Sequence, residues 1–326
     1  MTTLDFNERT LKNQQDVVKE EIRVNVKNQP YGGFMWLDIN QQAFQKWENN
    51  HDGYGSFEDL EGATVEDVAA FHRDYYGPNN AVLSIAGDVT AEEGFALAEK
   101  YFGDIESRPT PARPDVSEPI NTGEKRITQP DALAQVPALA VGWKIAERGS
   151  DDHAPTAVLA EVLAGGDASR MYQGLVKGRE MAINGQYLFG LTSPWEFDGP
   201  TLLTLFALYK PQFTADQLLA ALDEEIARIA EDGVGDEELA RVKTQMLADW
   251  NNGMESLISR ADNLARLQAI WGDAAVANQI PAWIENVDSA DIQRVASKYL
   301  TAENRTVIDR KPAAMLEAAA NNAGQE

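Results

Sequence analysis

The chain has 326 residues, enough for two domains of ordinary size, and its 44% hydrophobic and 25% charged residues are typical of a globular protein. It carries 28 Lys and Arg against 52 Asp and Glu, and this net charge of −24 argues against nucleic acid or an anionic membrane surface as a partner. The lack of cysteine excludes disulfides, thiolate catalysis and Cys-ligated zinc.

The first third of the chain is predicted to be mostly helical. Residues 7–27 repeat apolar side chains at helical spacing, and the Asn-, Gly- and aromatic-rich stretch 28–62 predicts loops and short helices. Thr64, followed by acidic residues, predicts the N-cap of the next helix. The apolar segment 81–88 predicts a buried strand, and a second capped helix follows it as far as Phe102.

Four prolines between residues 107 and 122 predict an extended inter-domain linker. Beyond it, sequence periodicity predicts strands over 125–130, 135–145, 184–193, 200–210 and 305–309. The same analysis predicts helices over 152–164, 168–178, 215–231, 236–251, 255–271 and 288–299. The Ala- and Asn-rich end of the chain predicts a frayed tail.

An internal repeat relates two distant regions at a constant offset of 224 residues. Residues 64–83 match residues 288–307, and the same offset places Val18-Lys19 on Val242-Lys243. The second copy begins near Arg126, so a complete first copy would begin roughly a hundred residues before Met1. We therefore expect a first copy without its front half, which would leave a strand without partners and apolar faces uncovered.

Four stretches resemble the pitrilysin/insulinase family of zinc metallopeptidases, which includes mitochondrial processing peptidases and bacterial periplasmic relatives. They are NQQDVVKEEI (13–22) with NQPYGG (28–33), ATVEDVAAFHRDYYGPNNAVLSIAGDV (63–89) with AEKYFGDI (98–105), LAGGDASRMYQGL (163–175), and DEELARVKTQMLADW (236–250). Together they span nearly the whole chain.

The resemblance implies an α/β (α+β) fold of tandem lobes, each a mostly antiparallel sheet covered by helices. In this family two lobes make a half, and two halves close around an unfolded peptide. The predicted domains are the back of an incomplete first lobe (1–106), a Pro-rich linker (107–124), a complete second lobe (125–312) and the frayed tail (313–326).

Zinc in this family is held by an inverted H-x-x-E-H motif and a later Glu, with one position left open for the water that attacks the peptide bond. The motif is absent from this sequence, and the resemblance leaves only Glu21 at the position of the third ligand. Gln14 stands where the family often has a supporting Glu. The alternative for Glu21 is a solvated carboxylate on an amphipathic helix. Either way, we expect no tightly bound zinc on this chain, because one carboxylate binds the ion weakly.

The family also uses an Arg/Tyr pair of the opposite half to bind substrate and to stabilise the tetrahedral intermediate. The resemblance places Val176 and Ile183 at these positions, so the pair is replaced here. Arg179 and Tyr187 are nearby but at the wrong spacing. This pattern implies a zinc-side half whose partner supplies the pair.

Other candidate residues favour structural roles. We interpret Gly165-Gly166 as a tight turn rather than an anion site, and Asp151-Asp152 as helix capping. His72 is interpreted as a surface or half-buried helix residue. One aromatic set is predicted either to line a peptide groove or to pack loops on the first lobe: Tyr31, Phe34, Trp36, Phe44 and Trp47.

Three hypotheses remain. In the leading hypothesis the chain is part of a zinc metalloendopeptidase half and is inactive by itself. In the second it is a non-catalytic scaffold subunit that pairs with an active half. In the third the start of the open reading frame is wrongly assigned. The expected partners are an unfolded polypeptide substrate and a second half or another copy, with no nucleic acid or membrane. The resemblance favours the bacterial periplasm, although residues 1–20 have no secretory signal and no apolar run spans a membrane.

Overall fold

The computed structural model describes residues 4–323, and the chain divides into two compact units. Unit 1 comprises the residues up to Ile22, Tyr54–Asp115 and Leu247–Pro281, and unit 2 comprises Arg23–Gly53, Val116–Met246 and the residues from Ala282 onward. The units interleave along the chain, whereas the predicted domains are consecutive stretches. The boundaries at 106, 124 and 312 stay a prediction.

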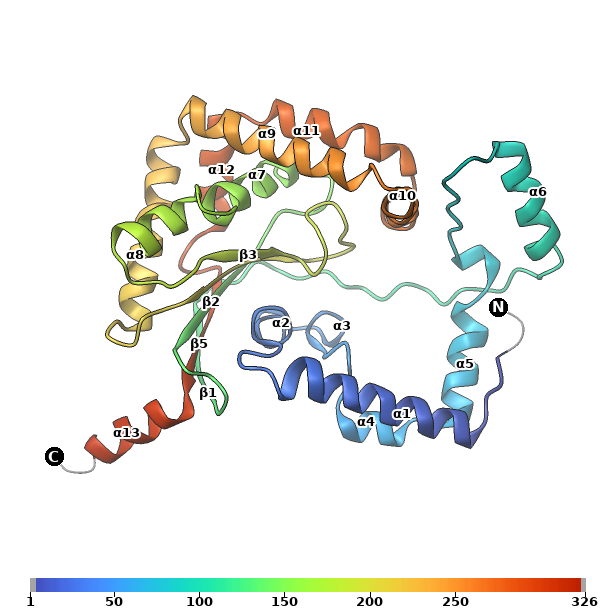
Figure 1. Cartoon of the computed structure of the whole chain (residues 1–326), viewed down its shortest axis with the longest axis horizontal. Helices are drawn as coiled ribbons and strands as arrows, with labels where there is room; N and C mark the ends of the chain where they lie inside the picture. Colours follow the sequence, from blue (N-terminus) through green and yellow to red (C-terminus); the bar gives the residue numbers. More distant parts are fainter. Residues whose placement is uncertain (1–3, 324–326) are drawn as a thin grey trace. The chain divides into compact units, whose positions relative to one another are not determined.

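Unit 2 is built on one five-stranded sheet of order β1-β5-β2-β4-β3 (Figure 1). The strands are β1 (Lys125–Asp131), β2 (Ala138–Lys144), β3 (Gln186–Phe189), β4 (Leu202–Leu208) and β5 (Arg305–Pro312). Only the β1–β5 pair is parallel among these, and the other three pairs are antiparallel. The predicted fold class, an α/β protein with a mostly antiparallel sheet, is therefore confirmed.

Helices cover both faces of this sheet. One layer contains α7 (His153–Ala164), α8 (Ala215–Asp232) and α12 (Ser289–Tyr299), which lie on the same side of the sheet in Figure 1 and pack on one another. The opposite face is covered by η2 (Phe34–Asp38) and α2 (Ile39–Ala43), which contact β2, β4 and β5. The remaining helices of unit 2 are η1 (Arg23–Lys27), α3 (Trp47–Asn50), η4 (Tyr172–Gly178) and α13 (Ala313–Ala323).

Phe34 and Phe44, two of the five residues in the predicted aromatic set, do not pack on the first lobe as one alternative predicted. Phe34 and Phe44 are buried against Ala140, Phe206 and Ile308, which belong to three strands of the unit 2 sheet. The rings fill the space over β2, where alanines leave room for them. That packing assignment was wrong because the segment belongs to unit 2, which sequence periodicity could not show.

A buried ion pair fixes the end of the Pro-rich linker. Lys144 on β2 donates to Glu118 at 3.0 Å, and both side chains are almost fully buried. The Glu118 carboxylate also accepts the backbone N–H groups of Gln45 and Lys46. Burial alone would raise the pKa of Glu118, but these hydrogen bonds outweigh it and lower the pKa to about 2. The linker is thus anchored at Glu118 rather than free along its length.

Removing this charge should destabilise unit 2. In Glu118→Gln, Lys144 keeps its buried charge without a counter-ion, and we expect a loss of about 3 kcal/mol in the free energy of unfolding. The low folded pKa means that wild type keeps this stabilisation above pH 4.5, the ordinary Glu pKa, and loses it as the pH falls toward 2. Urea unfolding measures both effects. The control Glu106→Gln, at an exposed position just before the linker, should change little; an equal loss in both variants would contradict the assignment.

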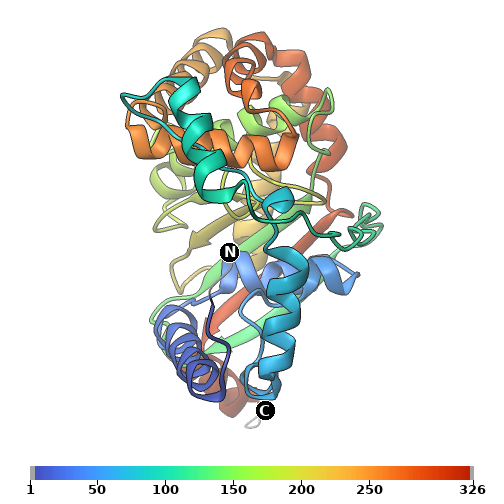
Figure 2. The ribbon, with the colours of Figure 1, turned by 90° about the vertical axis from the view of Figure 1, so that its right-hand side faces the viewer.

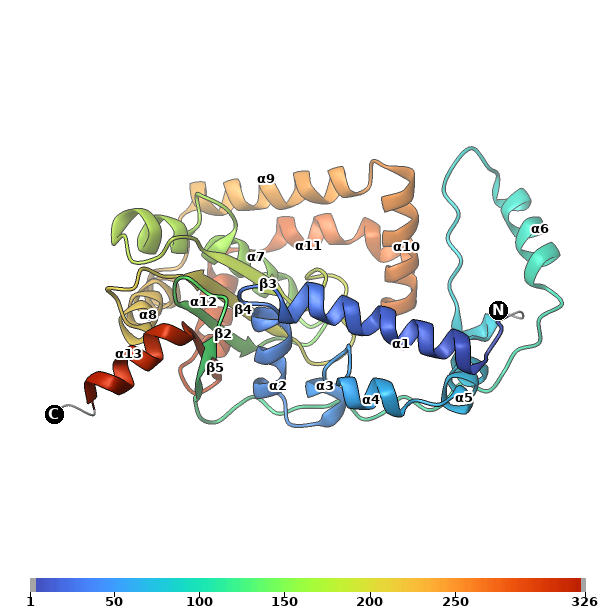
Figure 3. The ribbon, with the colours of Figure 1, turned by 60° about the horizontal axis from the view of Figure 1, so that its bottom comes forward.

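The regular secondary structure of unit 1, among its described residues, consists of helices alone. Its helices are α1 (Glu8–Ile22), α4 (Phe57–Gly62), α5 (Val65–Tyr75), η3 (Pro78–Asn80), α6 (Ala91–Phe102), α10 (Leu257–Trp271) and η5 (Ala274–Asn278). Two further helices, α9 (Asp236–Gly253) and α11 (Ile280–Asn286), run from one unit into the other and lie side by side in Figure 3. The Lys243 ammonium bonds the Glu285 carbonyl at 2.8 Å and links them.

The 224-residue repeat is reproduced in atomic detail. Helices α5 and α12 begin and end at residues related by this offset, and each opens with a capping box, Thr64 with Asp67 and Asp288 with Asp291. Each is followed by an asparagine amide that donates to the carbonyl of the last tyrosine. The two bonds are Asn80 to Tyr75 at 2.9 Å and Asn304 to Tyr299 at 2.7 Å. Two copies of one supersecondary unit are therefore present.

Two local predictions fail. Residues 81–86 form no strand, and Val82, Leu83 and Ile85 are 41%, 56% and 49% exposed. The reason is that the described chain provides no strand beside this segment, and a strand needs a hydrogen-bonded neighbour. The tail was predicted to fray, yet α13 continues to Ala323, since its alanines favour helix.

The two copies should respond differently to truncation of equivalent side chains. Val295 on α12 is fully buried, whereas its counterpart Phe71 on α5 is 57% exposed. We expect Val295→Ala to lower the free energy of unfolding by about 2 kcal/mol through lost packing. Phe71→Ala should change it by at most about 0.5 kcal/mol despite the larger deletion. Chemical denaturation would show the difference; a larger loss for Phe71→Ala would mean that α5 is covered.

Candidate functional site

Helix α1, which carries the predicted ligand Glu21, is fixed within unit 1 through one face. The Gln15 amide donates to the Leu60 carbonyl at 2.7 Å, and the Lys19 ammonium bonds Glu61 at 2.8 Å. These partners lie on or next to α4, and Lys19 is buried although it is charged. These two hydrogen bonds restrain the rotation of α1 about its own axis. The opposite face of the helix is therefore held in a defined direction.

That other face carries Glu21. Gln14, Val17 and Glu21 follow one another at helical spacing and are all exposed, whereas Gln15, Lys19 and Ile22 point to the packed side. Figure 1 shows α1 as an uninterrupted helix along this stretch. An exposed carboxylate on a fixed helix is geometrically able to act as one ligand. The structure is equally compatible with the solvated-carboxylate alternative.

The described residues do not complete a zinc site around it. Within residues 4–323, no three His, Cys, Asp or Glu side chains form a group that could hold a metal ion. His51 stacks on Trp47, and His72 lies between the rings of Phe6 and Tyr76. The residues present therefore do not fit a zinc centre by themselves, and the ligand role of Glu21 stays a prediction.

The two positions predicted for the family's Arg/Tyr pair, Val176 and Ile183, lie within η4 and five residues beyond its end. Val176 is half-buried, and Ile183 is 47% exposed while its N–H donates to the Leu208 carbonyl at 2.8 Å. Neither side chain can donate a hydrogen bond to a substrate carbonyl or an oxyanion. These two positions therefore offer shape and apolar surface only.

The nearby polar residues are committed elsewhere. Arg179 forms an ion pair with Glu224, which keeps the pKa of Arg179 above its ordinary value. The Tyr187 hydroxyl donates to the Glu161 carboxylate at 2.6 Å. Since both groups are bound to unit 2 itself, they are poor replacements for the missing pair.

The structure decides the predicted roles of Gly165-Gly166 and Asp152 at the two ends of α7. Gly166 has φ +73°, a left-handed value that favours glycine, so the pair Gly165-Gly166 does form a turn after α7. The capping prediction for Asp152 is wrong, because its side chain makes no cap hydrogen bond. Its carboxylate instead binds Arg294, Lys298 and the Tyr299 hydroxyl on α12, and a charge at this depth is stabilised better by those donors.

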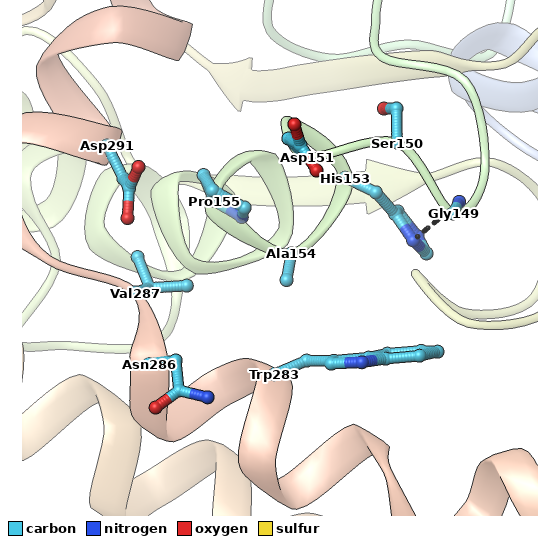
Figure 4. Close-up of a pocket in the computed structure, with 10 residues that line it drawn as sticks. All are labelled: Gly149, Ser150, Asp151, His153, Ala154, Pro155, Trp283, Asn286, Val287 and Asp291. Atoms are coloured by element: carbon cyan, nitrogen blue, oxygen red, sulfur yellow. Dashed lines mark hydrogen bonds between the residues drawn. The ribbon is translucent and has the colours of Figure 1, made fainter.

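A cavity of about 260 Å³ opens at the start of α7 (Figure 4). Gly149, Asp151 and Ala154 line one side, and the Trp283 ring lies across from them. His153 borders the cavity and is 2% exposed. No sequence pattern predicted this site, because its two sides come from segments about 130 residues apart in the chain.

His153 is held as a neutral ring. Its Nε2–H donates to the Pro194 carbonyl at 2.7 Å, and its Nδ1 accepts the Gly149 N–H at 3.3 Å. The rings of Trp195 and Phe197 enclose it at centroid distances of 5.3 Å. Burial lowers the pKa of His153, and the nearby Arg148 charge lowers it further, against the opposing effect of the Pro194 bond.

This lowered pKa predicts acid sensitivity. The unfolded chain binds a proton at His153 near pH 6.5, while the folded chain resists it, so stability is full above pH 6.5 and falls below it. We expect a slope of up to about 1.4 kcal/mol per pH unit, measured by urea unfolding between pH 8 and pH 5.5. His153→Gln should flatten this slope, whereas His51→Gln, at an exposed position, should keep it. A slope that survives in His153→Gln would assign it to another group.

The sequence and the fold are both similar to those of known proteins. The family described as the peptidase M16 inactive domain matches residues 62–246, more than half of the chain. The chain belongs to the M16 (pitrilysin) family. The matched range contains Val176 and Ile183.

Among relatives of this M16 chain, the zinc protease PqqE of Helicobacter pylori is 22% identical over 320 residues, covering 96% of this chain and 69% of PqqE. The uncharacterized zinc protease YmxG of Bacillus subtilis is 25% identical over 295 residues, covering 89% of this chain and 67% of YmxG. The crystal structure of a protease from Helicobacter pylori shares the fold with a TM-score of 0.86 at 22% identity, covering 96% of this chain and 74% of that one.

No helix within residues 4–323 combines the length and apolar character needed to cross a bilayer.

Proposed function

We propose that this M16 chain is the substrate-enclosing part of a zinc metalloendopeptidase half and does not cleave peptides by itself. The observation that carries the proposal is the sequence itself: it has the M16 domain over residues 62–246 but contains no H-x-x-E-H motif. Named relatives are zinc proteases, which supports zinc-dependent peptide hydrolysis as the activity to which the chain contributes.

Glu21 is the residue that we assign to the metal in this scheme. Its helix is fixed through Gln15 and Lys19, and its carboxylate lies on the exposed face. A zinc ion bound there would polarise a water or a carbonyl oxygen. Two further ligands would have to come from another polypeptide segment, because one carboxylate cannot hold the ion. In such a site Glu21 would act as a preoriented ligand.

The apolar residues Val176 and Ile183 support the need for a second half. A peptide chain in an M16 enclosure needs a donor for the oxyanion that develops at the scissile carbonyl, and these positions supply none. We therefore propose that the donors come from a partner half. A non-catalytic scaffold subunit is the second candidate, which the replaced pair and the incomplete ligand set also support.

Metal and activity measurements test the proposal together. After dialysis against buffer without zinc, the purified chain should retain well under 0.1 zinc per chain by elemental analysis, because its ligand set is incomplete. It should also leave a quenched fluorescent peptide uncut with zinc added. Stoichiometric zinc that Glu21→Gln removes, or hydrolysis that a chelator abolishes, would show a complete site in this chain. Glu20→Gln, on the same helix, is the matched control.

A further inference from the structure

The cavity at the start of α7 contains none of the residues assigned to zinc or to the Arg/Tyr pair. It lies in unit 2, between the first turn of α7, the end of α11 and the first turn of α12. Helix α7 packs on α12, and the light green ribbon of α7 lies beside the red-orange ribbon of α12 in Figure 2. Its volume of about 260 Å³ is just below that of pockets for drug-sized ligands. The cavity therefore has room for one long side chain rather than for a large cofactor.

The charges that line the cavity are negative. Asp151 and Asp291 contribute carboxylates, and none of the described lining residues is a lysine or an arginine. Asp151 is exposed, and its carboxylate forms no hydrogen bond or ion pair with any other residue in the range 4–323. His153 adds no positive charge at neutral pH, because burial lowers the pKa of its ring. The lining therefore favours a positively charged ligand.

The arginines closest to the cavity are already paired. Arg148 bonds Asp198 at 2.9 Å, and Arg294 bonds Asp152 at 2.9 Å as well as Asp291. Neither guanidinium is needed to balance the remaining lining carboxylate, and neither lines the cavity itself. A ligand would thus supply the counter-ion that the chain does not.

An anion fits this cavity poorly, although the N-terminus of a helix favours negative charge. The His153 N–H donates to the Ser150 carbonyl at 3.0 Å, and the Thr156 N–H donates to the Asp152 carbonyl at 3.0 Å. Pro155, which lies between them, has no N–H to offer. Since most donors of the first turn are used or missing and the lining carries carboxylates, a negatively charged ligand would be repelled.

The aromatic wall of the cavity favours an organic cation over a metal ion. Within residues 4–323 no three His, Cys, Asp or Glu side chains form a group that could hold a metal. Figure 4 shows the Trp283 ring edge-on, with one face turned toward the Ala154 side of the cavity. A cation over an indole face is attracted by the ring, and a guanidinium group also stacks on it. The Asn286 side chain, one turn further along α11, offers an amide oxygen as an additional acceptor.

We propose that this cavity binds the guanidinium group of an arginine side chain that belongs to another polypeptide. The planar group stacks on Trp283 and donates to the Asp151 carboxylate, and Asp291 adds negative potential. The methylene groups of the side chain pack on the apolar part of the lining, at Ala154 and Val287. Arginine suits the cavity better than lysine, because its flat group both stacks and forms bidentate bonds. This inference does not rest on the proposed function, because it uses none of the residues of that proposal.

Titration of the full chain with the blocked tripeptide acetyl-Ala-Arg-Ala-amide tests the proposal. The chain has 7 tryptophans, whose indole N–H signals can be followed by NMR, and the signal that is missing from Trp283→Leu belongs to Trp283. We expect this signal to shift with a dissociation constant on the order of 1 mM, because a single side chain supplies the contacts. The same tripeptide with citrulline in place of arginine has a similar shape and no charge. It should bind about tenfold more weakly, because the charge-assisted hydrogen bonds are lost.

Two variants separate the cavity from the general charge of the chain. Asp151→Asn should weaken binding of the arginine tripeptide about fivefold, because it removes the carboxylate that the guanidinium bonds. It should leave the melting temperature unchanged, since this carboxylate has no partner within residues 4–323. The matched control Asp167→Asn removes an equal charge at an exposed position beyond the other end of α7. This control should change the affinity less than about twofold.

Three results would overturn the proposal. The first is a Trp283 signal that does not move, or equal binding of the arginine and citrulline tripeptides. The second is equal weakening by Asp151→Asn and Asp167→Asn, which would mean that the peptide responds to net charge rather than to the cavity. The third is tighter binding of free arginine than of the blocked tripeptide. That result would assign the cavity to a free amino acid, whose α-carboxylate the acidic lining should otherwise repel.

Discussion

Strand β5 is hydrogen-bonded along both edges, to β1 and to β2, and the sheet of unit 2 depends on these two pairings. It joins β1 to the rest of the sheet, and the hydroxyl of Tyr209 reaches across to its Asp309 at 2.7 Å. The residue just before it, Asn304, donates to the carbonyls of Lys144 and Tyr299 and is bonded by Asn121. β5 is also the last of the five strands in the sequence. The sheet is therefore complete only after residues about 180 positions apart, in β1 and β5, have paired. Such a topology is expected to fold slowly.

The same requirement explains the difference between the two copies of the repeat. Capping boxes and the Asn80 bond connect residues within about five positions of one another, so α5 keeps them without any neighbour. A strand and an apolar helix face need partners from far along the chain. The first copy therefore retains its local structure, while segment 81–86 and the apolar face of α5 stay exposed. Burial, rather than sequence, separates the two copies.

This distinction also determines how much could be predicted from the sequence. The helix starts at Thr64 and Asp288, the sheet strands of unit 2 and the repeat itself are local or periodic signals, and the structure agrees with them. The segment predicted as a strand at 81–88 has apolar residues typical of a strand, but no described strand lies beside it to pair with. The aromatic cluster around Phe34 and the ligands of Asp152 depend on contacts over more than a hundred positions, and no pattern in one sequence encodes those. Of the candidate site, family resemblance proposes Glu21, Val176 and Ile183, which stay predictions, whereas nothing in the sequence pointed to the environment of His153.

The proposed function depends on how α1 presents Glu21. A metal centre needs ligands held in fixed directions, and α1 holds Glu21 by burying the opposite face of the helix, including the charged Lys19. A buried lysine is costly unless it is paired, so the ion pair of Lys19 with Glu61 on α4 restrains how α1 can turn, and Asp16 adds a pair within α1 itself. The restraint lies on the side of α1 away from Glu21, and in the function proposed above another segment would complete the exposed side. Such an arrangement suits a site assembled from several segments, in which this chain contributes orientation and the others contribute most of the chemistry.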